Sequence, residues 1–215
     1  MTRTGPPGRT VPSDTRTAPA STRERIVEAA LAALRAEGIA GISARSIARQ
    51  GGLNQALIFY HFGSIDALLV AVARSESERR SALYAEALRE VDSLAGLVAV
   101  ARRLHEEEFQ AGTVAALTQM LAGAVGGAEL AQGVRDAFEP WTAMVGETID
   151  RLLDGTPYAG LLPAADLTTA VAALFLGIEL LVGVDPDAAA GESLFGTMEA
   201  VAHLVDALIR SGAKS

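Results

Sequence analysis

The sequence contains no cysteine, which excludes disulfide bonds and thiolate chemistry and leaves nothing that requires an oxidising compartment. It also lacks the basic start and following apolar run of a signal peptide, because residues 1–21 alternate Thr, Pro, Gly, Ser and Arg. We therefore expect a cytoplasmic protein.

Strict alternation of apolar and polar residues between hairpin turns is missing as well, so a β-sheet is not expected. Apolar residues recur instead at helical spacing, in a chain of 215 residues that is 50% hydrophobic and 20% charged. A chain of this length and composition can bury a real core. We predict an all-α protein.

Groupings of residues that could carry catalysis are absent: we find no nucleophile with a base, no paired carboxylates and no metal cluster. His105-Glu106-Glu107-Glu108 is the segment that could suggest a metal, but its carboxylates scatter around a helix and no second histidine stands at ligand spacing. A solvated acidic face is favoured there. For His203, a lone histidine in the last expected helix, packing is favoured over chemistry. We expect no enzymatic activity, no cofactor and no metal.

Positive charge is scarce except near the start of the chain. Up to Leu69 there are eight arginines against five acidic residues, which leaves 10 of the 18 basic and 21 of the 26 acidic residues for the remainder. The net charge of -8 argues against a protein that coats nucleic acid generally. A basic first third on an acidic remainder suits a DNA-reading head on an acidic body.

The chain divides into three parts. Residues 1–21 read as a flexible tail; its arginines could form a basic arm for a minor groove, but a solvated leader is favoured. Residues 22–69 form a three-helix head, and residues 70–215 form a larger helical body. The helices are expected at 22–37, 43–51, 54–62, 65–89, 91–110, 113–124, 130–153, 165–184 and 192–210, with a kink at Pro140 and with Gly38 as the stop of the first.

The stretch from Ser43 to Phe62 reads as a helix, a glycine turn and a second short helix. Ser43 and Asn54 are placed to cap the two helices, and Gly51-Gly52 ends the first. Ile58 gives the second helix its buried side, yet the outer face of that helix is also apolar and aromatic. Such an outer face requires a partner.

The third helix ends in Phe59-Tyr60-His61-Phe62-Gly63-Ser64 and the chain continues with Asp66-Ala67-Leu68-Leu69. A three-helix head with this ending resembles the TetR family of bacterial transcriptional regulators. The resemblance implies a C-terminal ligand-binding and dimerising domain, two heads that read a palindromic operator in successive major grooves, and a small molecule that shifts their spacing and releases the DNA.

Three positions depart from the family's usual pattern. Phe59 stands where the family usually has a phosphate-binding tyrosine, although Tyr60 beside it keeps a hydroxyl. Ile65 replaces a usual lysine after Gly-Ser, and Ala56 replaces a common glycine. Phosphate clamping should therefore depend on other residues.

DNA contacts are predicted for eight residues of this head. Gln55 can pair with adenine, and Ala56 and Leu57 can rest on thymine methyl groups, although core packing is an equal alternative for Leu57. Tyr60 and His61 can donate to phosphates, and His61 could instead cap the preceding carbonyls. The predicted DNA-binding residues are Ser43, Arg45, Gln55, Ala56, Leu57, Phe59, Tyr60 and His61, of which Ser43 and Arg45 form a second phosphate clamp.

Aromatic and sulfur-containing side chains in the body are candidates to line a cavity for a small apolar or aromatic effector. Ordinary core packing is the alternative for each of them. The candidates are Phe109, Leu117, Met120, Leu121, Phe138, Trp141, Met144 and Phe175. Trp141, the only tryptophan, is the strongest because it follows Pro140.

The segment from Leu167 to Val184 nearly reaches the length of a membrane span. Glu179 sits inside it, Asp166 and Asp185 flank it, and no basic residue anchors either end, so a membrane span is rejected. We expect it to form, with the last helix, a four-helix interface between two chains. The predicted interface residues are Leu174, Ile178, Leu181, Val182, Met198, Val201, Leu204, Val205 and Leu208, with Glu179 as a register device or a pocket anchor.

These features together favour a ligand-responsive transcriptional regulator, a repressor that binds a palindromic DNA operator as a homodimer. The effector should be neutral or cationic and apolar, since no basic cluster marks the expected pocket. The alternatives are an all-helical protein-interaction module, for which the apolar face of the third helix would be a contact patch, and a small-molecule carrier without sequence-specific DNA binding.

Overall fold

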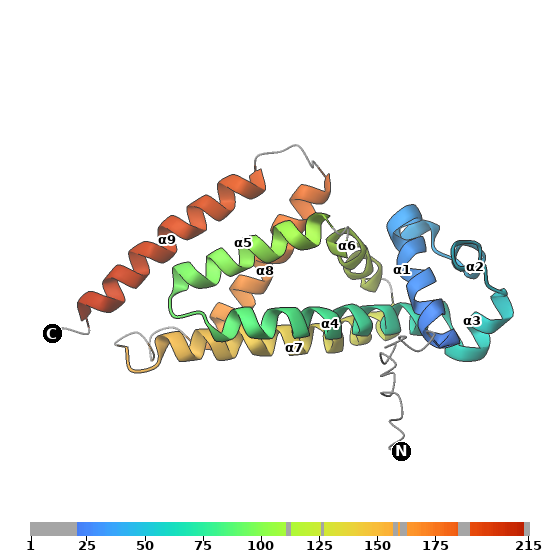
Figure 1. Cartoon of the computed structure of the whole chain (residues 1–215), viewed down its shortest axis with the longest axis horizontal. Helices are drawn as coiled ribbons and strands as arrows, with labels where there is room; N and C mark the ends of the chain where they lie inside the picture. Colours follow the sequence, from blue (N-terminus) through green and yellow to red (C-terminus); the bar gives the residue numbers. More distant parts are fainter. Residues whose placement is uncertain are drawn as a thin grey trace, which may run out of the picture.

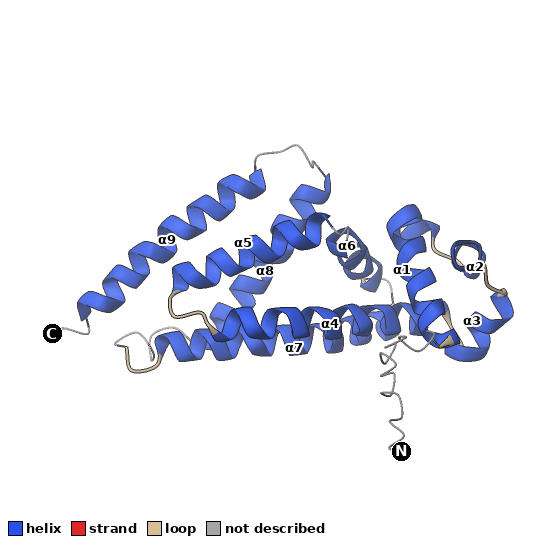
Figure 2. Ribbon diagram, in the orientation of Figure 1, coloured by secondary structure: helices blue, strands red, loops and turns tan. Residues whose placement is uncertain are grey.

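The computed structural model describes residues 21–110, 113–125, 127–156, 159, 163–184 and 190–212, and all regular structure in these residues is helical (Figure 2). The helices are α1 (Thr22–Gly41), α2 (Ala44–Gly51), α3 (Gln55–Phe62), α4 (Ile65–Arg89), α5 (Leu94–Gln110), α6 (Thr113–Ala124), α7 (Ala128–Leu153), α8 (Ala164–Val184) and α9 (Ala190–Gly212). The predicted all-α fold is confirmed. Residues 1–20, most of the predicted tail, lie outside the described part.

The molecule is elongated, with a head of three short helices at one end (Figure 1). Helix α4 begins in this head and runs beside α7 along the length of the body, and the two make the most extensive helix pairing in the structure. Helices α5, α8 and α9 stack at the far end, and α6 lies between them and the head. A displacement of α4 in the body is therefore carried directly to the head.

Local capping residues set the start of α1 and its end. The Ser21 hydroxyl accepts a hydrogen bond from the Glu24 N–H at 3.2 Å, and the Glu24 carboxylate accepts one from the Ser21 N–H at 2.7 Å. These bonds, from the backbone and then the side chain of Ser21, hold the pKa of Glu24 below its usual value. At the other end, Gly38 has φ 71° and interrupts the helix at the predicted stop. A short helical segment follows it and ends at Gly41.

One hydrophobic core spans the head and the near half of the body. Ile26, Ile47 and Ile58 from the head meet Met120 of α6 and Val134 of α7 in the same buried cluster. The predicted boundary near Leu69 therefore separates elements along the chain but not two independent cores. A polar bond reinforces the junction, because the Ile39 N–H donates to the Gln119 side-chain oxygen of α6 at 2.6 Å.

Two further clusters fill the rest of the body. One joins α4, α5 and α7, and the other joins α8 and α9 around Phe195, which is buried. Polar caps tie distant helices together here. Arg151 of α7 donates to the carbonyls of Leu88, in the last turn of α4, and of Val91, just after α4, at 2.8 and 2.6 Å. Asp206 of α9 accepts from the N–H groups of Leu94 and Ala95 at 2.9 and 3.0 Å, at the start of α5.

Asp206→Ala is expected to lower the free energy of unfolding by about 2 kcal/mol. The change removes both acceptors from a helix start whose amides are otherwise short of partners, and Asp206 itself is buried. Denaturant unfolding at one fixed protein concentration measures the loss. Asp150→Ala, at an exposed position on α7, is the control and should stay within about 0.5 kcal/mol of the original protein. Equal free energies of unfolding for the two variants would contradict the capping role of Asp206.

Helix α7 continues through Pro140, where a kink is predicted, so the proline does not end the helix. Proline has no backbone N–H, so one carbonyl in the preceding turn of the helix lacks its usual hydrogen-bond donor. In that turn the Ser77 hydroxyl of α4 donates to the Ala137 carbonyl, and the Thr142 hydroxyl donates to the Glu139 carbonyl at 3.0 Å. The neighbouring side chains thus supply hydrogen bonds around the proline.

Helix α8 is used as a packing helix of the body. By length and composition alone, Ala164–Val182 could cross a membrane, and α3 with α4 would pass the same test as a pair bent by 75°. In the fold, α8 packs against α6, α7 and α9. Only a small part of the stretch is buried within the subunit, and its exposed residues include Leu180 and Leu181. The side chain of Glu179 lies outside the described residues.

Candidate nucleic-acid interface and effector cavity

The turn between α2 and α3 is built by close backbone contact. Gly52 adopts the left-handed conformation with φ 59°, and the Leu53 N–H donates back to the Ala48 carbonyl at 2.9 Å. A Cβ on Gly51 would lie 2.6 Å from the Cβ of Ala29, so α2 can approach α1 this closely only with glycine there. Asn54 then caps α3 by accepting from the Ala56 N–H at 2.9 Å. The two helices are thereby fixed at the angle of a helix-turn-helix.

The outer face of α3 carries large aromatic side chains that the subunit leaves uncovered. Tyr60 is 82% exposed and Phe59 is 50% exposed. Gln55 and Ala56 are exposed beside them at the start of the helix. Because α3 is held by its other side, through Ile58, its outer face can enter a groove without disturbing the core.

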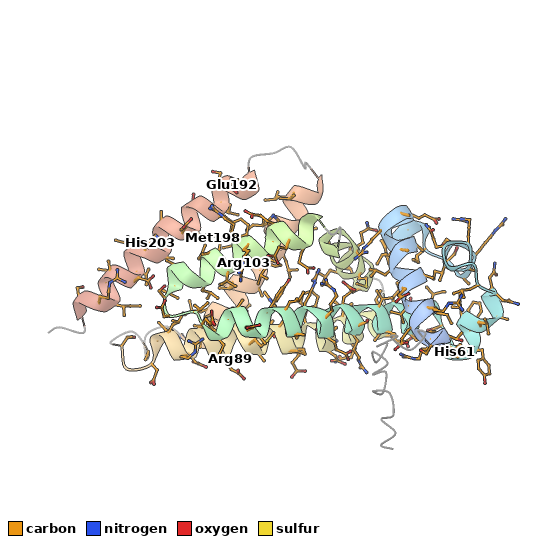
Figure 3. All side chains as sticks on the ribbon, viewed as in Figure 1. His61, Arg89, Arg103, Glu192, Met198 and His203 are labelled. Carbon is orange, nitrogen blue, oxygen red and sulfur yellow. The ribbon has the colours of Figure 1, made fainter. Side chains whose placement is uncertain are left out.

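Two other predicted contacts on α3 have packing roles as well. Leu57 is half-buried and packs against the first core cluster, which is the alternative that the sequence left open for it. His61 is half-buried, with its ring edge-on to Tyr60 at a centroid distance of 5.1 Å, at the head end of the molecule (Figure 3). Arg23 of α1 lies 4.8 Å over the ring of Phe62 and holds the end of α3.

The start of α2 presents the second part of this surface. The hydroxyl of Ser43 is engaged in its own helix cap, where it accepts from the Ser46 N–H at 3.1 Å and contacts the Ser46 hydroxyl at 3.2 Å. Arg45 is exposed. Because the first amides of a helix lack intrahelical partners, this end of α2 offers backbone donors and a guanidinium to an anion.

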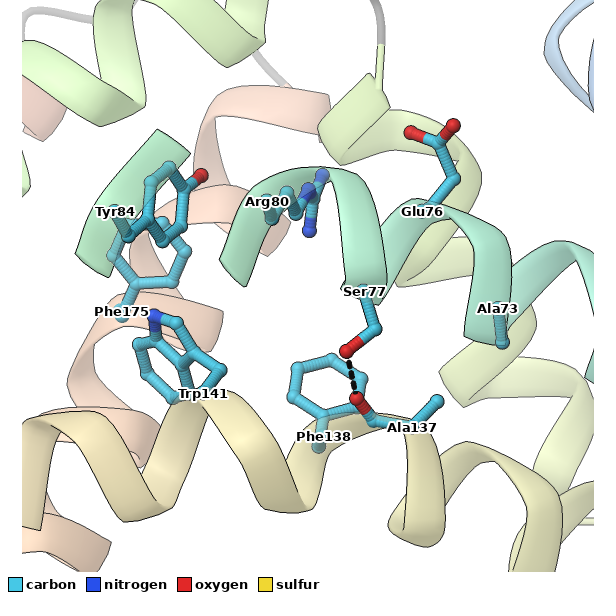
Figure 4. A pocket seen from close by; sticks show the side chains of 9 residues that line it. All are labelled: Ala73, Glu76, Ser77, Arg80, Tyr84, Ala137, Phe138, Trp141 and Phe175. Carbon is cyan, nitrogen blue, oxygen red and sulfur yellow. Dashed lines mark hydrogen bonds between the residues drawn. The ribbon is translucent and has the colours of Figure 1, made fainter. Parts of the chain in front are cut away.

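A cavity with two lobes lies inside the body. The smaller lobe is walled by α4, α7 and α8, and Figure 4 shows its lining side chains. The larger lobe lies between α4, α5, α7, α8 and α9. The volume that the centre of a water molecule can occupy is about 70 Å³ in the larger lobe and about 30 Å³ in the smaller lobe. Tyr84, Trp141 and Phe175 line both lobes, and we call these three aromatic side chains the waist of the cavity.

Helix α4 contributes a complete face to the smaller lobe. Ala73, Glu76, Ser77, Arg80 and Tyr84 recur at helical spacing along it. Since α4 also begins in the head, a molecule that occupies the lobe touches the element that carries the head. The spacing of these residues indicates a common face, but charged residues such as Glu76 and Arg80 are ordinarily found on the solvent side of a helix.

Charged side chains close the polar end of the smaller lobe. Glu108 of α5 contacts Arg79 at 3.0 Å and Arg80 Nε at 2.9 Å, and Glu76 contacts Arg79 at 3.2 Å. Burial alone would lower the pKa of Arg79, but the hydrogen bonds and negative charges of Glu108 and Glu76 outweigh burial and raise it. Glu108 and Glu76 thus favour the charged form of Arg79.

The solvated face expected for His105 to Glu108 is therefore wrong in part. Glu106 and Glu107 are exposed, whereas His105 is buried against the ring of Phe195 and Glu108 is only 4% exposed. The arginines of α4 make burial of Glu108 possible. Within the described residues, no group of three or more histidine, cysteine, aspartate or glutamate residues could hold a metal ion. His203 is exposed on α9 (Figure 3).

The predicted pocket residues separate into three groups. Phe138, Trp141 and Phe175 line the cavity. Met120 is buried in the core shared by head and body, Leu121 packs against the same core, and Met144 lines a separate surface groove between α4 and α7. The side chains of Phe109 and Leu117 lie outside the described residues. Sequence reasoning missed most walls of the larger lobe, which are aliphatic residues without a distinctive pattern.

An apolar stripe runs along the exposed side of α9. Val201, Leu204 and Leu208 recur at helical spacing, and Leu204 is 62% exposed. Leu180 and Leu181 of α8 are exposed in the same way. Exposed apolar side chains that gather on a surface are typical of sites that contact a partner.

The other predicted interface residues are turned inward. The structure places Ile178 and Val182 in the third core cluster, with Leu174 and Met198 packed against it, so they stabilise the subunit itself. Val205 is half-buried. The reason is geometric: α8 is apolar nearly all round, and its sequence does not distinguish the side that meets its own subunit.

The head, its exposed reading helix and the helical body with a cavity define a helix-turn-helix regulator. Residues 26–72 match the family model of "Bacterial regulatory proteins, tetR family". This match places the head of the chain in the TetR family of bacterial transcriptional regulators.

Solved structures of similar fold extend the likeness over most of the chain. A transcriptional regulator from Rhodococcus sp. RHA1 superposes with a TM-score of 0.70 at 20% identity, over 91% of this chain and 99% of that one. A second structure, that of a TetR-family regulator from Rhodococcus sp., has a TM-score of 0.68 at 18% identity, over 86% of this chain and 97% of that one. A regulator from Saccharomonospora viridis, solved in complex with choline, has a TM-score of 0.65 at 20% identity, over 82% and 92%. No curated protein matches the chain.

Proposed function

We propose that this protein is a homodimeric repressor that acts in the cytoplasm, binds a palindromic operator and releases it when a small effector enters the body. The outer face of α3 carries the proposal, because the subunit leaves the large aromatic side chains of Tyr60 and Phe59 exposed there. Gln55 and Ala56 read bases, while Tyr60, His61 and the start of α2 bind phosphates.

The remaining parts of the proposal rest on the body. The stripe of Val201, Leu204 and Leu208 supports association of two chains through α8 and α9, which would bring two heads to successive major grooves. The cavity supports ligand response, since its smaller lobe is walled by the helix that enters the head. The choline bound to the Saccharomonospora protein supports a small-molecule effector for this fold.

Salt dependence tests DNA binding directly. With about four phosphates neutralised per dimer, affinity for DNA from the protein's own promoter region should fall about 100-fold as salt rises from about 50 to about 200 mM. Fluorescence anisotropy with a labelled duplex measures this affinity. A scrambled duplex of the same length is the control and should bind more weakly at every salt concentration. Binding that ignores both salt and sequence would instead support a protein-interaction module with an apolar docking face.

A further inference from the structure

A closed set of charges lies at the polar end of the cavity, where two of its members, Glu76 and Arg80, line the smaller lobe. Glu76 and Glu108 provide two negative charges, and Arg79 and Arg80 provide two positive charges. All contacts within the set are between 2.9 and 3.2 Å, and the side chain of Glu108 is 5% exposed. The larger lobe has no charged residue among its lining side chains. The cavity as a whole is thus electrically balanced before any ligand enters.

Arg80 retains unused hydrogen-bonding capacity at this end. Its side chain is 11% exposed, and within the described part of the chain it donates only through Nε, to Glu108 at 2.9 Å. A guanidinium has five N–H donors, so the terminal nitrogens of Arg80 are left to meet an acceptor. The neighbouring Ser77 hydroxyl already donates to the Ala137 carbonyl (Figure 4).

The other end of the cavity offers only apolar contact. Beyond the waist of Tyr84, Trp141 and Phe175, the larger lobe is lined by aliphatic residues such as Leu97, Leu104, Val145, Ile178 and Met198. A molecule that fills both lobes therefore meets the terminal N–H donors of Arg80 at one end and apolar side chains at the other.

We propose that the effector is a neutral, mainly apolar molecule with one oxygen acceptor, such as an ester, ketone or amide carbonyl, at one end. The acceptor binds the terminal nitrogens of Arg80, and the apolar body passes Trp141 into the larger lobe. This inference rests on the proposed function, since it assigns the chemistry of that regulator's effector.

Charge balance excludes the two charged relatives of such a molecule. A carboxylate would bring a third negative charge to a set that already matches its two arginines. An organic cation would gain from the aromatic faces of Trp141 and Phe175, but both nearby carboxylates are already paired with arginine. In either case an unmatched charge would be buried, which is costly.

Three probes with the same eight-carbon chain test this inference: methyl octanoate, octanoate and octyltrimethylammonium. Trp141 is the only tryptophan in the chain and lines both lobes, so its fluorescence reports occupancy of the cavity without a label. Methyl octanoate should bind the unmodified dimer at least about tenfold more tightly than either charged probe. Preference for octanoate or for the cation, or no binding of methyl octanoate, would overturn the proposal.

Two variants shift the charge balance in opposite directions. Glu108→Gln keeps the shape of the side chain and leaves a net charge of about +1, so octanoate should gain about tenfold relative to methyl octanoate. Arg80→Met leaves a net charge of about -1 and removes the donors, so methyl octanoate should lose about tenfold while the cation gains. Glu107→Gln and Arg103→Met, at exposed positions of α5, are the matched controls and should keep the original order of probes.

The outcomes separate this inference from the function beneath it. An unchanged order of probes in both Glu108→Gln and Arg80→Met, with folded protein by circular dichroism, would overturn the role of the charge set. Salt-sensitive operator binding would then still stand. Loss of operator binding in the unmodified protein would contradict the regulator function without altering the order of the probes.

Discussion

Replacing Leu204 with glutamate is expected to give a monomer that binds the operator at least about 100-fold more weakly than the original protein. Leu204 lies in the middle of the apolar stripe on α9 and is 62% exposed in the subunit, so the subunit itself tolerates the change. In a dimer, the carboxylate would be buried against a second apolar stripe without a partner, at a cost of about 3 kcal/mol or more. One head alone keeps only half of the phosphate and base contacts.

Analytical ultracentrifugation measures the association state, and anisotropy with the labelled operator measures affinity. Val125→Glu is the matched control, since Val125 is 91% exposed at the end of α6 and lies outside the stripe. It should remain a dimer with unchanged affinity. A dimer of Leu204→Glu with intact operator binding would place the association surface elsewhere.

Tyr60→Ala is expected to weaken operator binding by about 100-fold without changing the free energy of unfolding. A hydrogen bond to a charged phosphate contributes about 1.5 kcal/mol, and a dimer loses two of them. The free energy of unfolding should not change because Tyr60 is 82% exposed. Anisotropy at one fixed salt concentration measures affinity, and denaturant unfolding measures stability.

Tyr60→Phe isolates the hydroxyl and should account for most of this loss. Leu83→Ala is the control, because Leu83 is an exposed apolar side chain on α4, away from α3. If Tyr60→Phe binds as tightly as the original protein while Tyr60→Ala does not, Tyr60 acts through apolar contact and the phosphate bond is wrong. Unchanged binding in both variants would contradict its part in the interface.

The sequence predicts those parts of the fold that depend on local chemistry. Ser43, Asn54 and Ser64 each cap a helix start through their own side chains, within three residues along the chain. Gly38 and Gly52 end helices because their left-handed conformations suit glycine alone. These signals need no knowledge of the rest of the molecule, and the helices that they bound are the ones that the sequence indicates.

The sequence fails where burial depends on partners from distant segments. Glu108 reads as part of a solvated acidic run, yet Arg79 and Arg80 approach it from 29 and 28 residues away and allow it to be buried. Helix α8 is apolar on most sides, so only the packing of Phe195 and Val98 against it shows that Ile178 points inward and Leu181 outward. The hydrogen bond to the Ala137 carbonyl near Pro140 likewise comes from a distant segment, the Ser77 hydroxyl of α4.

The core shared between head and body has a consequence for chimeric regulators. Met120, Leu130 and Val134 fill space between the head helices and α4, so a fragment that stops near Leu69 would expose apolar surface where they now pack. To transfer operator specificity to another regulator, one should therefore exchange only the outer face of α3. Alternatively, the head should be moved together with α6 and the first half of α7. The portable unit of this protein is larger than its DNA-reading motif.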